Sequence, residues 1–155
     1  MEIRSSERHH LALIGQVPDA CSLTWGWRRR GLAGFYCIGR ISRYCARMRA
    51  DGVLDENRYV TSVDAWDLGR ASKMARWGLG ARFGTLQEAE AAVVQAGRAA
   101  ALAYRSWQDF SAGYILGRCL HFDEEDFGSW YTDMVDAHRI LMTDPGSPWL
   151  NIPFR

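Results

Sequence analysis

The sequence of 155 residues is 48% hydrophobic and 12% aromatic, with seven Trp residues and a formal net charge of +1. A chain of this length and apolar content can bury one core, which excludes the disordered class and is typical of a single domain. Nucleic-acid-binding domains are usually strongly basic, and a net charge so close to zero is not. We therefore do not expect nucleic acid as a partner.

No run of apolar residues approaches the roughly 18 residues that a membrane-spanning helix needs. The N-terminal sequence MEIRSSERHH mixes acidic and basic residues ahead of the short apolar stretch LALIG, which is not the pattern of a signal peptide. We therefore expect a cytoplasmic protein without a membrane span. The four Cys residues contain no CxxC pair, so we expect small buried side chains and no zinc site: Cys21, Cys37, Cys45 and Cys119.

The charge is unevenly distributed along the chain. Residues 1–50 carry nine Arg and three acidic residues, whereas residues 51–155 carry ten basic and fifteen acidic residues. Two interpretations remain open at this stage. The basic segment either packs against the acidic remainder of the same domain or forms a docking surface for an acidic partner.

Helical periodicity dominates the chain, and few segments alternate as strands do. The pattern of residues 1–24 is ambiguous, with Pro18 and Asp19 marking a loop or a helix start. Residues 25–50 are predicted to form a helix, which the turn residues Asp51-Gly52 end.

A connection over residues 51–61 leads into the next predicted helix. That helix begins near Ser62, which together with Asp64 offers N-cap chemistry, and it extends to about Leu79. Glycines at positions 78, 80 and 84 then indicate a loop.

Two further helices carry clear start signals. Thr85 and Glu88 have the spacing of a capping box for an Ala-rich helix over residues 86–105. Ser106 is the expected N-cap of a helix over residues 107–122. That helix is apolar almost all round, so we expect it to be the central, buried element.

The last predicted helix opens at Asp123 to Asp126, where acidic side chains suit the positive end of the helix dipole, and it extends to about Met142. The tail after it contains three Pro residues, so we expect it to be non-helical and to pack across the helices through Trp149, Ile152 and Phe154. These elements predict an all-α fold, a compact single-domain bundle of about five helices with an irregular Pro-rich tail. Residues 1–155 form this domain, with residues 1–22 as a peripheral segment.

Five polar residues fall on the apolar faces of three predicted helices: Asp67, Arg70, Arg118, His121 and His138. A buried charge without a partner is very costly, so these residues need contacts with one another or with a ligand. One interpretation is an internal polar network that joins Asp67 to Arg70 or Arg118. The other is an anion pocket lined by Arg70, Arg118 and either His121 or His138.

The sequence shows no catalytic motif. His121 and His138 have acidic neighbours, but neither has the spacing of HExxH or of a Glu-x-x-His di-metal site. There is no GxSxG sequence, and the glycines at 78, 80 and 84 lack the Lys-Ser/Thr of a phosphate-binding loop. We therefore expect no metal and no cofactor, and we assign no catalytic residue.

Two charged surfaces are candidates for partner binding. Five Arg residues project to one side of the helix over residues 25–50: Arg28, Arg29, Arg40, Arg43 and Arg47. A solvated or internally paired face explains them better than phosphate binding does, given the charge of the whole chain. The second surface is the acidic stretch Asp123, Glu124, Glu125 and Asp126.

Three blocks of sequence occur in order along the chain. The first block is AWDLGR at 65–70 with ARWG at 75–78, the second is YRSW at 104–107 with GYILGR at 113–118, and the third is SPW at 147–149. Together they resemble the bacterial family called domain of unknown function 1266. The resemblance covers about residues 23–154. Trp27 is a departure, since members usually carry an aliphatic residue after Trp-Gly.

The resemblance implies an all-helical protein whose motif residues include Trp66, Asp67, Arg70, Trp107, Gly117 and Arg118, with Trp149 in the closing block. It carries no established chemistry. Small proteins of this kind are often encoded beside secreted toxins, so it also implies an immunity role in which the protein neutralises a toxin by binding it. We therefore expect a non-enzymatic interaction protein with a protein partner. The alternative is a small-ligand binding protein or an enzyme that uses the anion pocket.

Overall fold

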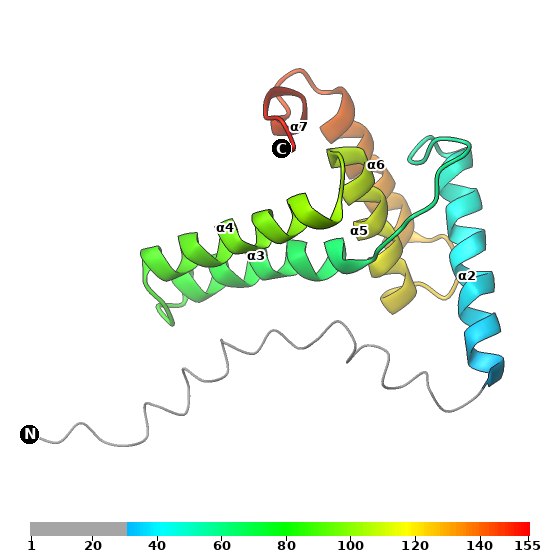
Figure 1. The fold of residues 1–155 in the computed structure, drawn as a ribbon, viewed down its shortest axis with the longest axis horizontal. Coiled ribbons are helices and arrows are strands. Elements are labelled where there is room, and N and C mark those ends of the chain that lie inside the picture. The colour runs from blue at the N-terminus through cyan, green and yellow to red at the C-terminus, as the bar shows by residue number, and fades with distance from the viewer. Residues whose placement is uncertain (1–30) are drawn as a thin grey trace, which may run out of the picture. The chain divides into compact units, whose positions relative to one another are not determined.

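The structure is a computed structural model that describes the backbone of residues 31–155 and the side chains of residues 37–155. Predictions for residues 1–30, among them the helix start at 25 and the positions of Cys21, Arg28 and Arg29, lie outside this range. The described helices are α2 (Gly31–Ala50), α3 (Asp64–Gly80), α4 (Leu86–Ala103), α5 (Trp107–Phe122), α6 (Ser129–Thr143) and α7 (Pro148–Asn151). The described residues form no strand, which confirms the all-α fold class (Figure 1).

Residues 37–155 form one compact unit, which the contacts within the chain separate from residues 1–36. The prediction that the whole chain is a single domain therefore stays a prediction.

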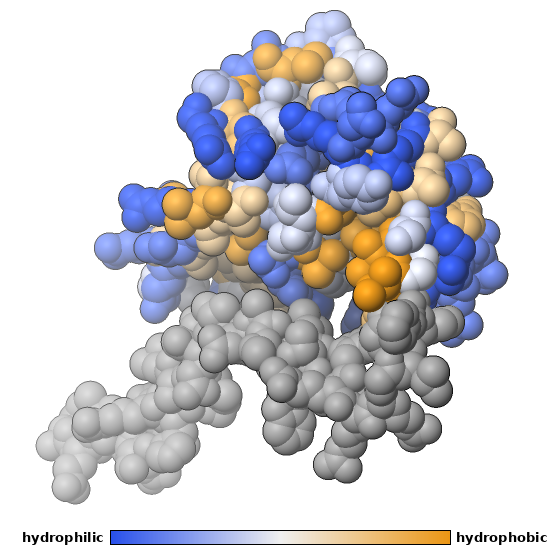
Figure 2. All heavy atoms as spheres, turned by 45° about the vertical axis from the view of Figure 1, so that its right-hand side comes forward, coloured by the Kyte–Doolittle hydropathy of each residue, from blue (hydrophilic) through white to orange (hydrophobic). Residues whose placement is uncertain are grey.

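No helix in the described part of the chain is long and apolar enough to cross a membrane. On the face shown in Figure 2, hydrophobic residues (orange) reach the surface between hydrophilic ones (blue). The cytoplasmic location also stays a prediction.

Helix α5 is the most buried helix of this unit, as its apolar character predicts. The Ser106 side chain accepts a hydrogen bond from the backbone N–H of Asp109, so the expected N-cap is confirmed. Seven of its residues are buried, and α3 and α6 both pack against it. The core around it also includes Tyr44 and Met48 of α2 and Tyr131 of α6.

Two glycines of α5 allow the start of α3 to lie directly on it. A Cβ atom at Gly113 would come within 2.7 Å of the Ser62 carbonyl oxygen, and one at Gly117 within 2.7 Å of the Trp66 Cβ. Contacts this short do not occur in well-packed interiors, so any side chain at either position would separate the two helices. The sequence GYILGR of the second motif therefore has a packing role.

A buried tyrosine holds the first turn of α3. The Tyr104 hydroxyl accepts a hydrogen bond from the backbone N–H of Ala65 at 2.7 Å and donates one to the Ser62 carbonyl at 3.1 Å. Helix α3 starts at Asp64 after Val63, one residue later than a Ser62 cap predicts. The Ser62 hydroxyl still accepts a hydrogen bond from the Asp64 N–H at 3.0 Å.

Helix α4 begins with the predicted capping box. The Thr85 side chain accepts from the Glu88 N–H, and the Glu88 carboxylate accepts from the Thr85 N–H at 2.8 Å. The helix ends at Ala103, two residues before the predicted end, because Tyr104 is extended and turns its side chain toward α3. Helices α3 and α4 form an antiparallel hairpin whose connection lies far from α6 (Figure 1).

The predicted start of the last helix is wrong, since α6 begins at Ser129 and residues 123–128 form a loop. Asp123 is buried there and accepts hydrogen bonds from the Tyr44 hydroxyl and from the Phe127 N–H. Glu125 and Phe127 both have positive φ angles, 72° and 51°, which a helix excludes. The carboxylate of Asp123 thus folds the loop around a core tyrosine instead of capping a helix.

The tail contains one helical turn, so the prediction that it is non-helical is wrong for these residues. Ser147 caps α7, and Pro148 occupies its first turn, where a missing N–H has no consequence. Trp149 stacks on Trp107 at 5.4 Å, and the Trp107 indole N–H donates to the Ile152 carbonyl at 2.9 Å. With Phe154 at 4.9 Å from Trp107, the expected packing of the tail is confirmed for Trp149 and Phe154, whereas the Ile152 side chain is 57% exposed.

A histidine–serine contact joins α6 to α5. The His138 Nδ1 lies 2.9 Å from the Ser111 hydroxyl oxygen, and both side chains are buried. They line an apolar cavity of about 190 Å³ together with Tyr114, Met134 and Trp149. Burial lowers the pKa of His138, and the neighbouring Arg139 charge lowers it further.

We predict that Gly117→Ala and Gly113→Ala each lower the free energy of unfolding by about 1–3 kcal/mol, the usual cost of overpacking. Gly97→Ala is the matched control, because Gly97 lies within α4 and has open space at its Cβ position. It should raise stability by about 0.5–1 kcal/mol through helix propensity. Urea unfolding followed by circular dichroism measures all three, and equal effects at Gly97 and Gly117 would contradict the close contact.

We also predict that stability falls as the pH decreases below about 6.5, the ordinary pKa of His. The unfolded chain takes up a proton that the buried His138 resists, because the folded-state pKa is the lower of the two. His138→Gln should flatten this part of the pH profile. Identical slopes in the wild type and in His138→Gln would show that His138 does not cause the loss.

Candidate functional site

Arg118 of α5 lies between two indole rings. Its guanidinium carbon is 4.8 Å from the Trp130 ring centroid and 5.7 Å from the Trp66 centroid, distances typical of cation–π contacts. The Arg118 Nε atom is buried and has no hydrogen-bond partner. Within residues 37–155 no acidic side chain forms an ion pair with Arg118, so the expected network with Asp67 is not formed around it.

The backbone packing described above creates this arrangement. Gly117 brings the first turn of α3 onto α5, which places Trp66 beside Arg118. Gly69, one turn later on α3, leaves room for the ring of Tyr114, and Trp66 meets that ring edge-on at 5.1 Å. Trp130 belongs to the first turn of α6, so three helices contribute to the surroundings of one guanidinium.

Arg70 lies on the same indole. Its guanidinium carbon is 5.4 Å from the Trp66 centroid, and its Nη1 is 3.8 Å from the Asp67 carboxylate. Both side chains are about half exposed, at 52% for Arg70 and 51% for Asp67. The predicted Asp67–Arg70 pair is thus present, but at the surface and not inside a buried network, and exposed pairs of this kind contribute little to stability. The sequence pattern placed Asp67 and Arg70 on the apolar face of α3. Helices α4 and α5 cover only part of that face, so both side chains remain exposed.

His121 and Phe122 complete the cluster. The His121 ring meets Phe122 edge-on at 4.4 Å, and Phe122 stacks on Trp130 at 4.8 Å and contacts Trp66 at 5.9 Å. The Phe122 and Trp130 side chains remain partly exposed, so the cluster is open to solvent. We call the following set the aromatic–cation cluster: Trp66, Arg70, Arg118, His121, Phe122 and Trp130.

His138 belongs to a different part of the fold. It contacts Ser111 and lines the apolar cavity described above, whose lining does not include Arg118. Of the two His residues proposed for an anion pocket, the structure thus brings only His121 to the cluster. The Ser111–His138 contact was missed at the sequence level because Ser111 lies in an apolar run with no motif around it. The described residues contain no group of three metal-ligating side chains.

The Arg face of α2 is paired within the chain. Arg43 binds the Glu125 carboxylate through Nε at 3.0 Å and through Nη2 at 2.8 Å, while Arg40 donates to the Asp123 carbonyl at 2.7 Å. Arg47 donates to Asp51 at 2.7 Å. This arrangement agrees with the interpretation that the basic segment packs against acidic residues of the same domain.

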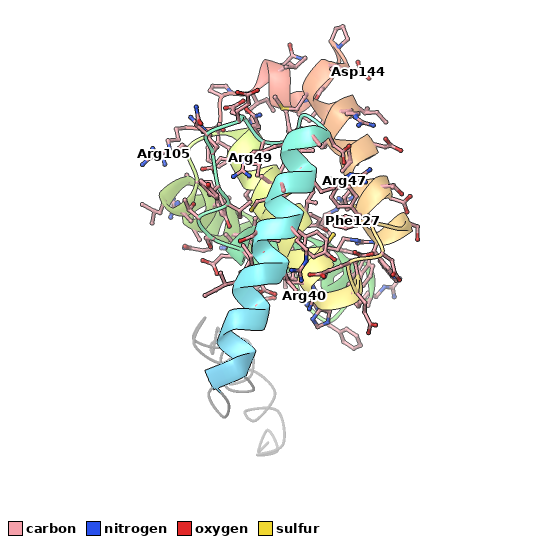
Figure 3. The ribbon with its side chains drawn as sticks, turned by 90° about the vertical axis from the view of Figure 1, so that its right-hand side faces the viewer. Arg40, Arg47, Arg49, Arg105, Phe127 and Asp144 are labelled. Atoms are coloured by element: carbon pink, nitrogen blue, oxygen red, sulfur yellow. The ribbon has the colours of Figure 1, made fainter. Side chains whose placement is uncertain are left out.

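Figure 3 shows Arg40 and Arg47 on α2, with Arg47 beside Phe127 of the α5–α6 connection, whose ring centroid is 5.5 Å away. Glu124 and Asp126 of the acidic stretch are exposed, whereas Asp123 is buried. A role for either charged surface in partner binding stays a prediction. The Tyr44–Asp123 hydrogen bond was missed because no local pattern links residues so far apart in the sequence.

The α3–α4 hairpin leaves large apolar side chains uncovered, which the sequence analysis did not foresee. Met74 and Trp77 of α3 are 58% and 59% exposed. The other exposed apolar residues of the hairpin are Phe83, Leu86, Val93, Val94 and Leu102. The hairpin thus presents an apolar surface of its own.

A groove follows one side of this hairpin. One hollow of about 490 Å³ lies between Leu68 and Ser72 of α3, Val93 and Gly97 of α4, and the tail residue Phe154. A second hollow of about 380 Å³ continues toward the connection of the hairpin and shares Val93 with the first. Its lining also includes the residues Arg76, Leu79, Leu86, Ala89, Glu90 and Val94. We call the two hollows together the hairpin groove.

Comparisons with known proteins identify the family and nothing finer. No curated protein and no solved structure matches the chain. The family model described as "Protein of unknown function (DUF1266)" matches residues 3–154. That range contains the aromatic–cation cluster, the hairpin groove and all described helices. Because the match spans nearly the whole sequence, the chain belongs to this family.

Proposed function

We propose that the protein is a non-enzymatic interaction protein whose hairpin groove holds an amphipathic helix of a partner protein. The observation that carries the proposal is the exposure of apolar residues along α4, namely Leu86, Val93, Val94 and Leu102. Among the described helices, α3 is the only one with which α4 makes extensive contacts. When the apolar surface of a helix is larger than the area that its neighbours cover, the exposed remainder indicates a binding surface.

The shape of the groove suits a helix. Small residues of α4 line it at Ala89, Ala96, Gly97 and Ala100, which allows another backbone to come close. On α3 the groove extends from Leu68 to Leu79, which at a rise of about 1.5 Å per residue corresponds to about 16 Å, or three turns. Three turns accommodate the i, i+3 or i+4 and i+7 anchor residues of a helix bound in a groove.

The charge around the groove indicates the chemistry of the partner. From Arg70 to Arg82 the chain carries four basic residues, and no acidic residue occurs between Asp67 and Glu88. Arg76 lines the groove on its α3 side, and Glu90 lines it on its α4 side. We therefore expect the partner helix to present acidic residues toward α3, since complementary charges orient association and raise its rate.

The narrower form of the proposal is an immunity protein that neutralises a toxin by direct binding. It requires in addition that the captured partner be toxic when it is produced alone. Co-production with the wild-type protein should then restore growth, because occupation of the toxin is sufficient for neutralisation and needs no catalytic residue.

We predict that the double variant Leu86→Gln/Val93→Gln binds the partner at least about tenfold more weakly, because it removes two apolar anchors from the groove. Both side chains are exposed, so the fold should be unaffected. Ile140→Gln is the matched control, since Ile140 is exposed on α6 and does not line the groove. The partner is first captured by the tagged protein and identified by mass spectrometry, and the purified pair is then titrated by calorimetry.

Binding that is lost in the groove variant and retained in Ile140→Gln supports the proposal. Wild-type affinity in the groove variant would overturn it. Light scattering of the protein alone provides a second test. A dimer that the groove variant dissociates would show that a second copy of the chain occupies the groove, in place of another protein.

A further inference from the structure

Arg118 is a mostly buried cation without an acceptor. It forms no hydrogen bond or ion pair with any residue that the structure describes, and its Nε is fully enclosed. Buried polar side chains almost always have a hydrogen-bond partner, and an exception requires a physical reason. The indoles of Trp66 and Trp130 stabilise the positive charge through their ring faces.

Cation–π contacts leave the hydrogen-bonding capacity of a guanidinium unused. The group carries five N–H donors in its plane and no acceptor, whereas a ring contacts the group through its π face. The enclosed Nε cannot reach a ligand, but the two Nη atoms of Arg118 retain donors of the geometry that binds carboxylate and phosphate oxygens in pairs. A cation held between rings is also pre-organised, so less side-chain entropy is lost when an anion binds.

A second cation lies on the same ring. The guanidinium carbons of Arg70 and Arg118 lie 5.4 Å and 5.7 Å from the Trp66 centroid, so Trp66 is a neighbour of both cations. Arg70 has one acidic contact, Asp67 at 3.8 Å, which is too long for a hydrogen bond. His121 lies one turn beyond Arg118 on α5, is exposed, and packs its ring against Phe122.

We infer that the aromatic–cation cluster is a binding site for the oxyanion group, carboxylate or phosphate, of a small molecule. The oxyanion accepts hydrogen bonds from Arg118 and Arg70. The exposed parts of Phe122 and Trp130 provide an apolar surface for the body of the same molecule. None of the residues that line the hairpin groove belongs to the cluster, so this inference does not depend on the proposed partner.

The experiment observes the arginine directly. The Nε–H signals of a ¹⁵N-labelled protein are recorded while inorganic phosphate, benzoate or phenyl phosphate is added at constant ionic strength. The Arg118 signal is assigned from its loss in Arg118→Lys. We expect a saturable shift of the Arg118 signal, with tighter binding of phenyl phosphate than of phosphate because its ring contacts the apolar surface. A response to benzoate alone would identify carboxylates as the ligand class, and a response to phosphate and phenyl phosphate alone would identify phosphates.

Two variants distinguish a built site from general attraction of anions to a charged surface. Arg70→Gln removes a half-exposed side chain, so it should fold normally and bind the responding probe about tenfold more weakly. Arg139→Gln removes an equally exposed Arg that pairs with Asp136 on α6, and it should leave the affinity unchanged. This pair keeps the test valid even if removal of Arg118 impairs folding.

The inference is overturned if Arg118 shows no saturable shift with any probe before the Arg139 signal begins to move, which marks nonspecific binding. It is also overturned if Arg70→Gln and Arg139→Gln weaken binding equally. Either result would assign Arg118 to helix packing alone. Loss of partner binding in the groove variant is a separate measurement, so the two proposals fail independently.

Discussion

The close contact between α5 and the start of α3 is the constraint on which the rest of the described fold depends. Gly113 and Gly117 leave no room for a side chain, so the Ser62 carbonyl and Trp66 lie directly on the α5 backbone. Tyr104 then reaches the first turn of α3 from the far end of α4 and fixes the hairpin to the same place. The close packing of α3 on α5 thus determines both where Trp66 meets Arg118 and where the hairpin starts.

The same contact explains why the hairpin has an uncovered surface. Helix α3 contains 17 residues, and α5 crosses it through residues of its first half, Trp66 and Gly69. Beyond them α3 has α4 as its neighbour, and two helices cannot enclose the apolar faces of both. Met74, Trp77 and Leu86 consequently remain exposed. Exposed apolar side chains in a folded domain are costly for solubility, which is the reason to interpret them as an interface.

Local signals in the sequence were sufficient for most of the fold, and interactions distant in sequence account for the errors. The Thr85–Glu88 capping box and the Ser106 cap involve residues within one turn, so their pattern alone identifies both helix starts. The start of α6 was misplaced because Asp123 binds Tyr44, a residue on another helix, instead of capping its own. The candidate cluster was partly predictable: a polar residue on an apolar stripe marked Arg118. Its surroundings were not, because the projection of single helices shows neither how far α5 covers α3 nor which rings lie across the contact.

In the described part of the chain, the basic residues of α2 are paired within the domain, whereas several basic residues on and beside α3 are not. This difference favours the hairpin over α2 as the functional surface. The Arg residues of α2 are paired with acceptors of the same domain, with Arg43 held by two hydrogen bonds to Glu125. Such pairs must be broken before these side chains can bind anything else, which reduces any gain from a partner. The described contacts of Arg118 are cation–π contacts with two indoles, and those of Arg76 and Lys73 include no ion pair. Positive charge without acidic partners therefore gathers on α3 and beside it, where apolar side chains are also exposed, and a ligand or partner that binds there gives up none of the ion pairs that hold α2 in place.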